Sequence, residues 1–175
     1  TGGPVHVVAA GGIFDGRGLA MAMSLGASAV WVGTRFVAAE EAGAPPRHQK
    51  GVVGAGYHDT IRTIIYSGRP MRVLKNKYAV DWEENRQAEI KELTSQGHVP
   101  AFYDMERREK SGEEMDFKER MDAMPLLMGQ GAGAVNEVMP AKQIMDEMVT
   151  GAVEILKRQA STITAVSDMK LTASL

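Results

Sequence analysis

The first forty residues contain two short apolar runs, each followed by glycine and then by a helix-forming segment. Residues 4–10 (PVHVVAA) form the first run and residues 29–32 (AVWV) form the second. Apolar, β-branched runs of this length are typical of strands that are buried on both faces of a parallel sheet. We expect helices at 17–25, capped by Gly26, and at 36–41. This strand–helix–strand–helix order requires a parallel sheet and predicts an α/β fold.

The pattern changes after residue 43. We expect a loop or short helix at 47–57, a strand at 60–66 that 71–74 continue, and a charged helix at 81–93. The charge-dense stretch 106–120 is expected to be a solvated helix or a mobile segment. A last amphipathic helix follows Pro140, with apolar residues spaced by three and four: Ala141, Ile144, Met145, Met148, Val149, Val153 and Leu156.

Composition excludes several classes of protein. Twenty Lys and Arg against 22 Asp and Glu give a net charge of −2, so nucleic acid is not an expected partner. No apolar run approaches the ~18 residues that a membrane span needs, so no membrane partner is expected either. The absence of cysteine excludes disulfides and zinc–thiolate sites and is compatible with a reducing compartment. We expect a cytoplasmic protein.

The two glycine loops are the first candidate site. Gly11 and Gly12 follow the first strand, Gly33 and Thr34 follow the second, and each loop opens a helix. The first N–H groups of a helix lack partners and lie at its positive end, which favours anions. Glycine lets the backbone approach a phosphate, and (β/α)8 barrels often hold phosphate on the loops after their last two strands. The pair therefore predicts a phosphate site, although Gly11 and Gly12 could form only a tight turn.

Other conspicuous residues favour structural roles. Asp15 precedes a helix, so its carboxylate is expected to cap the helix rather than to act as an acid or base. His6 lies within the first expected strand and is interpreted as a packed or hydrogen-bonded core residue. Most of the twelve methionines, including Met21, Met23, Met145 and Met148, are expected to fill gaps in the core.

Four blocks of sequence closely resemble the nitronate monooxygenase family, flavin enzymes once called 2-nitropropane dioxygenases. The resemblance runs from about residue 4 to residue 156. The blocks occur in the family's order: 8–13 (VAAGGI) with 15–18 (DGRG); 25–27 (LGA) with 32–36 (VGTRF); 67–70 (SGRP) with Arg72, Asn76 and 81–84 (DWEE); and 129–133 (GQGAG). The AAGGI and GTRF pair alone is also similar to other flavin barrels, including FMN-dependent enoyl reductases.

The resemblance implies a fold and a cofactor. The chain would be the C-terminal part of a (β/α)8 TIM barrel with a smaller α+β second domain. Its parts would be two last βα units at 1–43, the second domain at 44–134, a helix at 135–160 that packs back, and a tail at 161–175. FMN would be the cofactor, bound by Ala10, Gly11, Gly12, Trp31, Val32, Gly33, Thr34 and Gln130, with the backbone of the two loops on its phosphate.

Several assignments within the resemblance stay open. Trp31 replaces a polar residue that is common at this position in relatives. Gln130 either lines the flavin or substrate pocket or caps its own loop. Arg69 is interpreted as a residue that ties the second domain together, with a pocket role as the alternative.

The implied activity is oxidation of alkyl nitronates by O2 to a carbonyl compound and nitrite. None of the four histidines stands in the family's Gly-Gly-His context, so we assign no catalytic residue. The expected catalytic His, and the N-terminal half of the barrel as a partner, would lie outside this chain, and no metal is implied. Two alternatives remain: an enoyl-reductase-like barrel that uses NAD(P)H, and a truncated, non-catalytic binding module.

Overall fold

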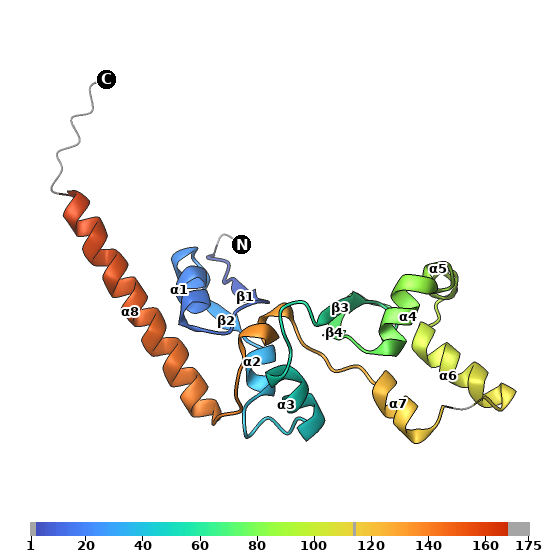
Figure 1. Ribbon diagram of the computed structural model, residues 1–175. Coiled ribbons are helices and arrows are strands. Elements are labelled where there is room, and N and C mark those ends of the chain that lie inside the picture. Colours follow the sequence, from blue (N-terminus) through green and yellow to red (C-terminus); the bar gives the residue numbers. More distant parts are fainter. Residues whose placement is uncertain (1–2, 114, 168–175) are drawn as a thin grey trace. The chain divides into compact units, whose positions relative to one another are not determined.

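A computed structural model describes residues 3–113 and 115–167 of the chain (Figure 1). The described residues form two compact units. Unit 1 contains the residues up to Gly43 together with those from Val138 onwards, and unit 2 contains Ala44–Glu137. Each unit has its own apolar core.

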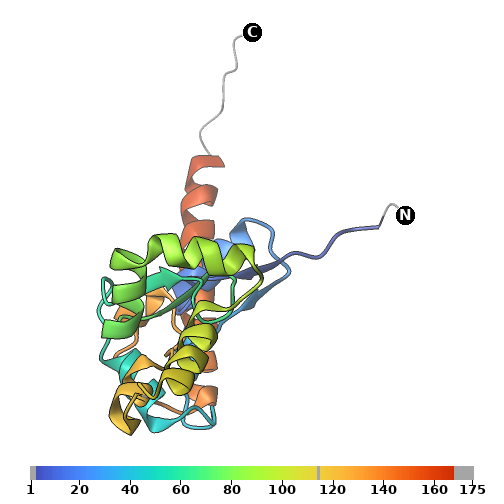
Figure 2. The same ribbon diagram turned by 90° about the vertical axis from the view of Figure 1, so that its right-hand side faces the viewer.

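Unit 1 is built on two parallel strands. Its elements are β1 (Val8–Ala10), α1 (Gly16–Ser24), β2 (Ala29–Trp31), α2 (Thr34–Val37) and α8 (Ala141–Ser167). Strand β1 pairs with β2 in parallel, with Val8 opposite Ala29 and Ala10 opposite Trp31. The predicted parallel βα pair is therefore confirmed. Both strands are shorter than the apolar runs, and residues 3–7 form an extended lead-in to β1 (Figure 2).

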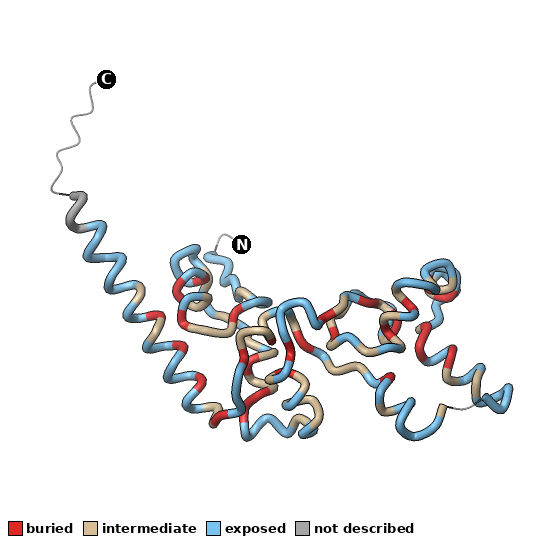
Figure 3. Tube along the Cα trace, in the orientation of Figure 1, coloured by how far each residue is buried: buried red, intermediate tan, exposed pale blue. Residues whose placement is uncertain are grey.

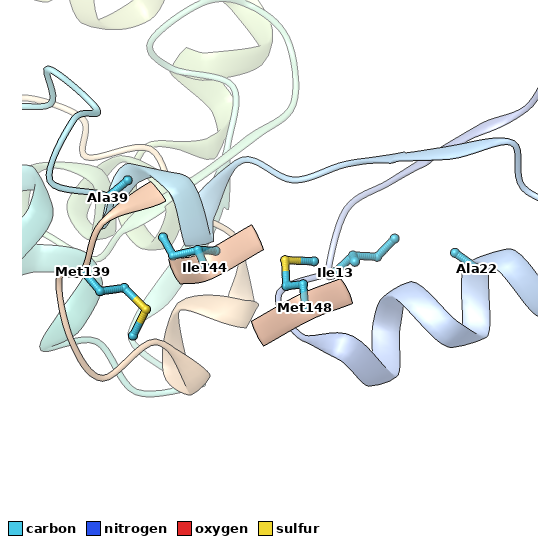
Figure 4. Packing of buried hydrophobic residues seen from close by; sticks show 6 residues of the cluster. All are labelled: Ile13, Ala22, Ala39, Met139, Ile144 and Met148. Carbon is cyan, nitrogen blue, oxygen red and sulfur yellow. The ribbon is translucent and has the colours of Figure 1, made fainter. Parts of the chain in front are cut away.

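The core of unit 1 joins segments that are far apart in the sequence (Figure 4). Ile13 and Ala22 contribute from the first loop and α1, and Ile144 and Met148 contribute from the first turns of α8. Ala39 and Met139 complete the cluster, and Ala9 of β1 and Val30 of β2 pack against it. One face of the two-stranded sheet is thus covered by helices.

The other face of the sheet differs from the prediction. We expected both strands to be buried on both faces, but Val8 is 53% exposed and Trp31 is 73% exposed. Side chains alternate between the faces of a strand, so the residues next to Ala9 and Val30 point away from the core. Helices α1, α2 and α8 all pack with the Ala9–Val30 side, which leaves the second face open in the described part of the chain.

The last helix also differs from the prediction. It begins at Ala141, continues to Ser167 rather than ending near residue 160, and buries only part of its apolar surface. Buried positions recur on one side of its first half, and residues 156–163 are exposed (Figure 3). Met145, Val149 and Val153 are among the exposed apolar residues, because α8 packs mainly along α1 with one of its sides. Residues 168–175 of the expected tail lie outside the described residues.

The predicted role of the methionines holds only in part. Met148 is buried, but Met21, Met23 and Met145 are 56%, 44% and 56% exposed. Helical spacing gives the phase of an apolar stripe, but it cannot tell how much of that stripe a neighbouring element covers.

Unit 2 combines one antiparallel hairpin with helices. Strands β3 (Thr60–Thr63) and β4 (Met71–Leu74) pair with Ile61 opposite Val73. The other elements are α3 (Pro46–Val53), α4 (Lys77–Asn85), α5 (Gln87–Ser95), α6 (Pro100–Ser111), α7 (Phe117–Ala123) and the 3-10 helix η1 (Gln130–Ala134). Its core contains Ile65, Ala79, Trp82, Ile90 and Leu93.

Two expected segments of unit 2 are divided in the structure. The single helix at 81–93 is instead the pair α4 and α5, because Arg86 between them has a non-helical backbone and lays its guanidinium 3.3 Å from the centre of the Trp82 ring. The charged stretch 106–120 belongs to α6 and α7. Gly112 ends α6 in the left-handed conformation, and Asp116 and Glu119 form a capping box that starts α7.

Helices α1 and α8 approach each other most closely at two glycines. A Cβ atom on Gly16 would lie 2.7 Å from the backbone nitrogen of Ala152, closer than side-chain atoms can come. A Cβ atom on Gly151 would lie 3.5 Å from the Cα of Gly16, which is ordinary contact. The backbones therefore touch at Gly16, and the packing of unit 1 depends on the missing side chain there.

We predict that Gly16→Ala lowers the free energy of unfolding by about 2 kcal/mol, since the methyl group would push α8 away from α1. Gly151→Ala is the matched control. It adds the same methyl group on the facing helix without a clash and improves helix propensity, so no loss of stability is expected. Thermal and urea unfolding of both variants measure the difference, and equal stabilities would contradict the proposed contact.

In the parts of the chain that the structure describes, none of the helices combines the length and the apolar character that crossing a bilayer requires.

Candidate functional site

The two glycine loops lie next to each other at the carboxyl edge of the β1–β2 sheet. The register pairs Ala10 with Trp31, the last residues of the two strands. Gly11 and Gly12 follow Ala10 directly, and Val32, Gly33 and Thr34 follow Trp31. Seven of the eight predicted cofactor-binding positions therefore gather at one edge, where parallel strands place their following loops side by side.

The backbone at the first loop requires glycine. Gly11 and Gly12 have φ angles of +93° and +70°, which residues with a side chain rarely adopt. No atom lies within 4 Å of the position that a Cβ would take on either residue, and the same is true of Gly33. Conformation rather than crowding thus explains the glycines at 11 and 12, and the space beside all three is open to a ligand.

The start of each helix is fixed by local contacts. Asp15 accepts a hydrogen bond from the N–H of Gly18 at 2.9 Å and caps α1, as predicted. In the second loop, Gly33 precedes the short helix α2, and its carbonyl accepts bonds from Phe36 and Val37. These contacts fix the residue at which each helix begins after its loop.

A buried arginine anchors α2 to the segment before α8. Arg35 is 8% exposed, and its Nη2 donates to the sulfur of Met139 at 2.9 Å. The backbone of Met139 bonds to Ala38 and Glu40, and the carboxylate of Glu41 accepts from the N–H of Ala141. The loop that contains Thr34 is therefore held by contacts with residues about one hundred positions later.

Gln130, the eighth predicted position, belongs to unit 2. It is exposed at the first residue of η1, and its role in a pocket stays a prediction. The same short helix contains Gly133, where a Cβ would lie 2.6 Å from the backbone nitrogen of Tyr57. Gly133 of the GQGAG block is therefore required by its close packing against the backbone of Tyr57.

The remaining candidates are exposed. His6 lies before β1 rather than within a buried strand, so its interpretation as a core residue is wrong; its Nδ1 lies 3.3 Å from the Ser28 hydroxyl. Arg69 is exposed in the hairpin loop, where its backbone bonds to the Ser67 hydroxyl. Within the described ranges, no group of three or more His, Asp and Glu residues is arranged to hold a metal ion.

A buried ionic cluster in unit 2 was not predicted from the sequence. Asp104 is fully buried on α6, and its carboxylate accepts from Arg86, Arg107 and Arg108 at 2.7–3.0 Å and from the Tyr78 hydroxyl at 3.1 Å. Only Arg107 and Arg108, at i+3 and i+4, could have been paired with it from helical spacing.

The cluster keeps Asp104 ionised. Burial by itself would raise the pKa of the Asp104 carboxyl, but the hydrogen bonds from Arg86 and Arg108 outweigh it and lower the pKa below its usual 3.8. Burial raises the pKa of Tyr78, and the charge of Asp104 raises it further. A buried carboxylate with four donors is satisfied and closed to solvent, so we assign this cluster to the stability of unit 2.

The fold and the site define a class of protein. Parallel strands joined by a helix, with helices packed on one face, are the arrangement of an α/β protein, and the two glycine loops lie at the carboxyl edge of its sheet. The sequence profile described as "Nitronate monooxygenase" matches residues 4–151. The chain belongs to the nitronate monooxygenase family.

Known proteins are similar over most of the chain. A "Probable nitronate monooxygenase" from Bacillus subtilis is 31% identical over 86% of this chain and 41% of its own length. The structure of FabK from Thermotoga maritima superposes with a TM-score of 0.64 and 32% identity, over 91% of this chain and 48% of that one. Nitroalkane oxidase from Streptomyces ansochromogenes gives 0.63 and 28%, over 90% and 42%. The structural neighbours are TIM-barrel enzymes, and the chain spans less than half the length of each of these three proteins.

We predict that Asp104→Asn lowers the free energy of unfolding at pH 7 by about 3 kcal/mol, since a neutral amide would replace the buried carboxylate that Arg86, Arg107 and Arg108 share, while Glu89 still pairs with Arg86 and Arg107. The pKa of Asp104 is lowered by folding, so its contribution is present above pH 3.8 and is lost as pH falls through the folded value. The difference between the two proteins should therefore shrink below about pH 3.8.

Glu106→Gln is the control for this experiment. Glu106 also lies on α6 and pairs with Lys110, but both side chains are largely exposed, so no measurable change is expected. Urea unfolding at pH 7 and at pH 3 measures both variants. A stability gap for Asp104→Asn that did not change with pH would show that the charge is not what stabilises the cluster.

Proposed function

We propose that the chain is the C-terminal part of an FMN-dependent nitronate monooxygenase, an oxidoreductase that converts alkyl nitronates and O2 into a carbonyl compound and nitrite. The observation that carries this proposal is the register of β1 and β2. It brings Ala10–Gly12 and Trp31–Thr34 to one sheet edge, in the blocks for which the sequence resembles this family. Membership of the family supports the reaction class.

The residues present fit a phosphate group. Gly11 and Gly12 are exposed and have positive φ angles, and open space lies beside both residues and Gly33. We assign the phosphate of FMN to the backbone N–H groups of this loop and of Gly33 and Thr34, with the Thr34 hydroxyl as a further donor. FMN would supply the redox chemistry, while these residues bind and orient it.

The open face of the sheet supports the barrel. Parallel sheets are normally covered on both faces, yet Val8, at the amino end of β1, is exposed on one of them. The relatives are more than twice as long as the matched part of this chain. We propose that an N-terminal half of the barrel supplies the remaining strands and the catalytic base, a His in the family's Gly-Gly-His context, which would accept the substrate's proton.

We predict that purified protein that includes the N-terminal half releases FMN on denaturation and binds added FMN. Gly12→Ala should weaken FMN binding about tenfold, because alanine avoids the positive φ of Gly12 and would change the conformation of the loop to which we assign the phosphate. Flavin fluorescence titration measures the affinity, and mass spectrometry identifies the released flavin.

Gly26→Ala is the matched control. Gly26 also has a positive φ and open space, but it follows α1 at the amino end of β2, away from the glycine loops. It should lower stability like Gly12→Ala and leave FMN affinity unchanged. If the protein neither contains FMN nor binds added FMN, the assignment of the FMN phosphate to the two glycine loops is wrong.

We predict nitrite release from an alkyl nitronate in the presence of O2, without any nicotinamide cofactor. Nitrite is measured colorimetrically, and oxygen uptake is measured with an electrode. Rapid reduction of the flavin by NADH or NADPH, with no nitrite formed from nitronates, would instead favour the enoyl-reductase-like reaction. Loss of both reactions from a flavin-loaded protein would favour a binding module.

A further inference from the structure

The edge that contains the two glycine loops has one bulky side chain on its open side. Ala10, Gly11, Gly12 and Gly33 contribute at most a methyl group, whereas Trp31 contributes an indole. Trp31 is 73% exposed, although it ends a strand of the sheet on which unit 1 is built. The chain's other tryptophan, Trp82, is completely buried in unit 2.

The position of the indole follows from the register. Ala9 and Val30 pack on the core of unit 1, so Ala10 and Trp31, the next residues along their strands, point to the opposite face. Directly paired residues lie side by side on one face, and the partner of Trp31 is the small Ala10. The indole therefore lies beside the small side chain of Ala10, where the first glycine loop begins.

An exposed tryptophan leaves much apolar surface in water, since its side chain buries roughly 150–250 Å² when covered. Val32, the next residue, turns back to the core, so no other large side chain of this strand end shares the open face. A ligand whose phosphate lay on the glycine loops would extend its remaining part past this edge. An aromatic ring is the group that covers an indole best.

We infer that the Trp31 side chain binds the non-phosphate part of the cofactor, while the backbone of the glycine loops binds its phosphate. This inference rests on the proposed function, which assigns FMN to these loops. Two neighbouring parts of the site would then bind different parts of FMN. Trp31 would contact the flavin ring and the sugar chain, and the loop that contains Gly12 would bind the phosphate.

The test compares FMN with riboflavin, which lacks the phosphate. Trp31→Ala should weaken the binding of both flavins by a similar factor, roughly five- to hundredfold, which is the range for loss of one aromatic side chain that stacks on a nucleic-acid base. Trp31→Phe should restore most of the affinity, because the ring is kept. Gly12→Ala should weaken FMN and leave riboflavin unchanged. The visible circular dichroism of bound FMN should also change in Trp31→Ala, which gives a second measure of contact.

Val8→Ala is the matched control, because Val8 lies on the same open face two residues before Ala10. It should leave both affinities unchanged. If Trp31→Ala does not fold, Trp31→Leu keeps an apolar side chain without the ring, and it should still bind both flavins more weakly than Trp31→Phe.

The outcomes separate this inference from the proposed function. Wild-type affinity of Trp31→Ala for both flavins would overturn the inference and leave the FMN assignment intact. Weaker FMN binding with unchanged riboflavin binding would also overturn it, since the indole would then act on the phosphate. If the wild-type protein that includes the N-terminal half binds no flavin, the proposed function itself fails.

Discussion

The parallel pairing of β1 with β2 is the constraint on which the rest of unit 1 depends. It places Ala10 opposite Trp31, and so it brings two loops that are more than twenty residues apart in the sequence to the same edge. The pairing also decides which residues face the core, since Ala9 and Val30 pack on α1 and α8 while their neighbours face outward. A shift of one residue in register would turn the core-facing residues of one strand to the open face.

Glycine serves two different physical purposes in this chain. At Gly11 and Gly12 it permits a backbone conformation with positive φ, and the space beside it is open. At Gly16 and Gly133 it permits close approach, because a side chain would collide with the backbone of another segment. The first kind belongs to the candidate cofactor site, and the second kind holds the fold together.

The two units differ in how completely they bury their conspicuous side chains. Unit 2 neutralises a buried carboxylate, Asp104, with three arginines and closes its core around Trp82. Unit 1 leaves one face of a parallel sheet exposed, with Trp31 at its edge. Burial marks Asp104 as a stabilising group, whereas Trp31 is available to a ligand at the edge that holds the glycine loops.

The sequence by itself determined the parallel βα pair, the capping role of Asp15 and the positions of both glycine loops, because each depends on local spacing and on residue-specific backbone preferences. Only the tertiary structure decided which apolar residues are buried: Met145 and Val149 share the helical spacing of Ile144 and Met148, but α1 covers just one side of α8. The division of residues 81–93 into two helices and the cluster around Asp104 were likewise decided by contacts between distant residues, which local pattern does not encode.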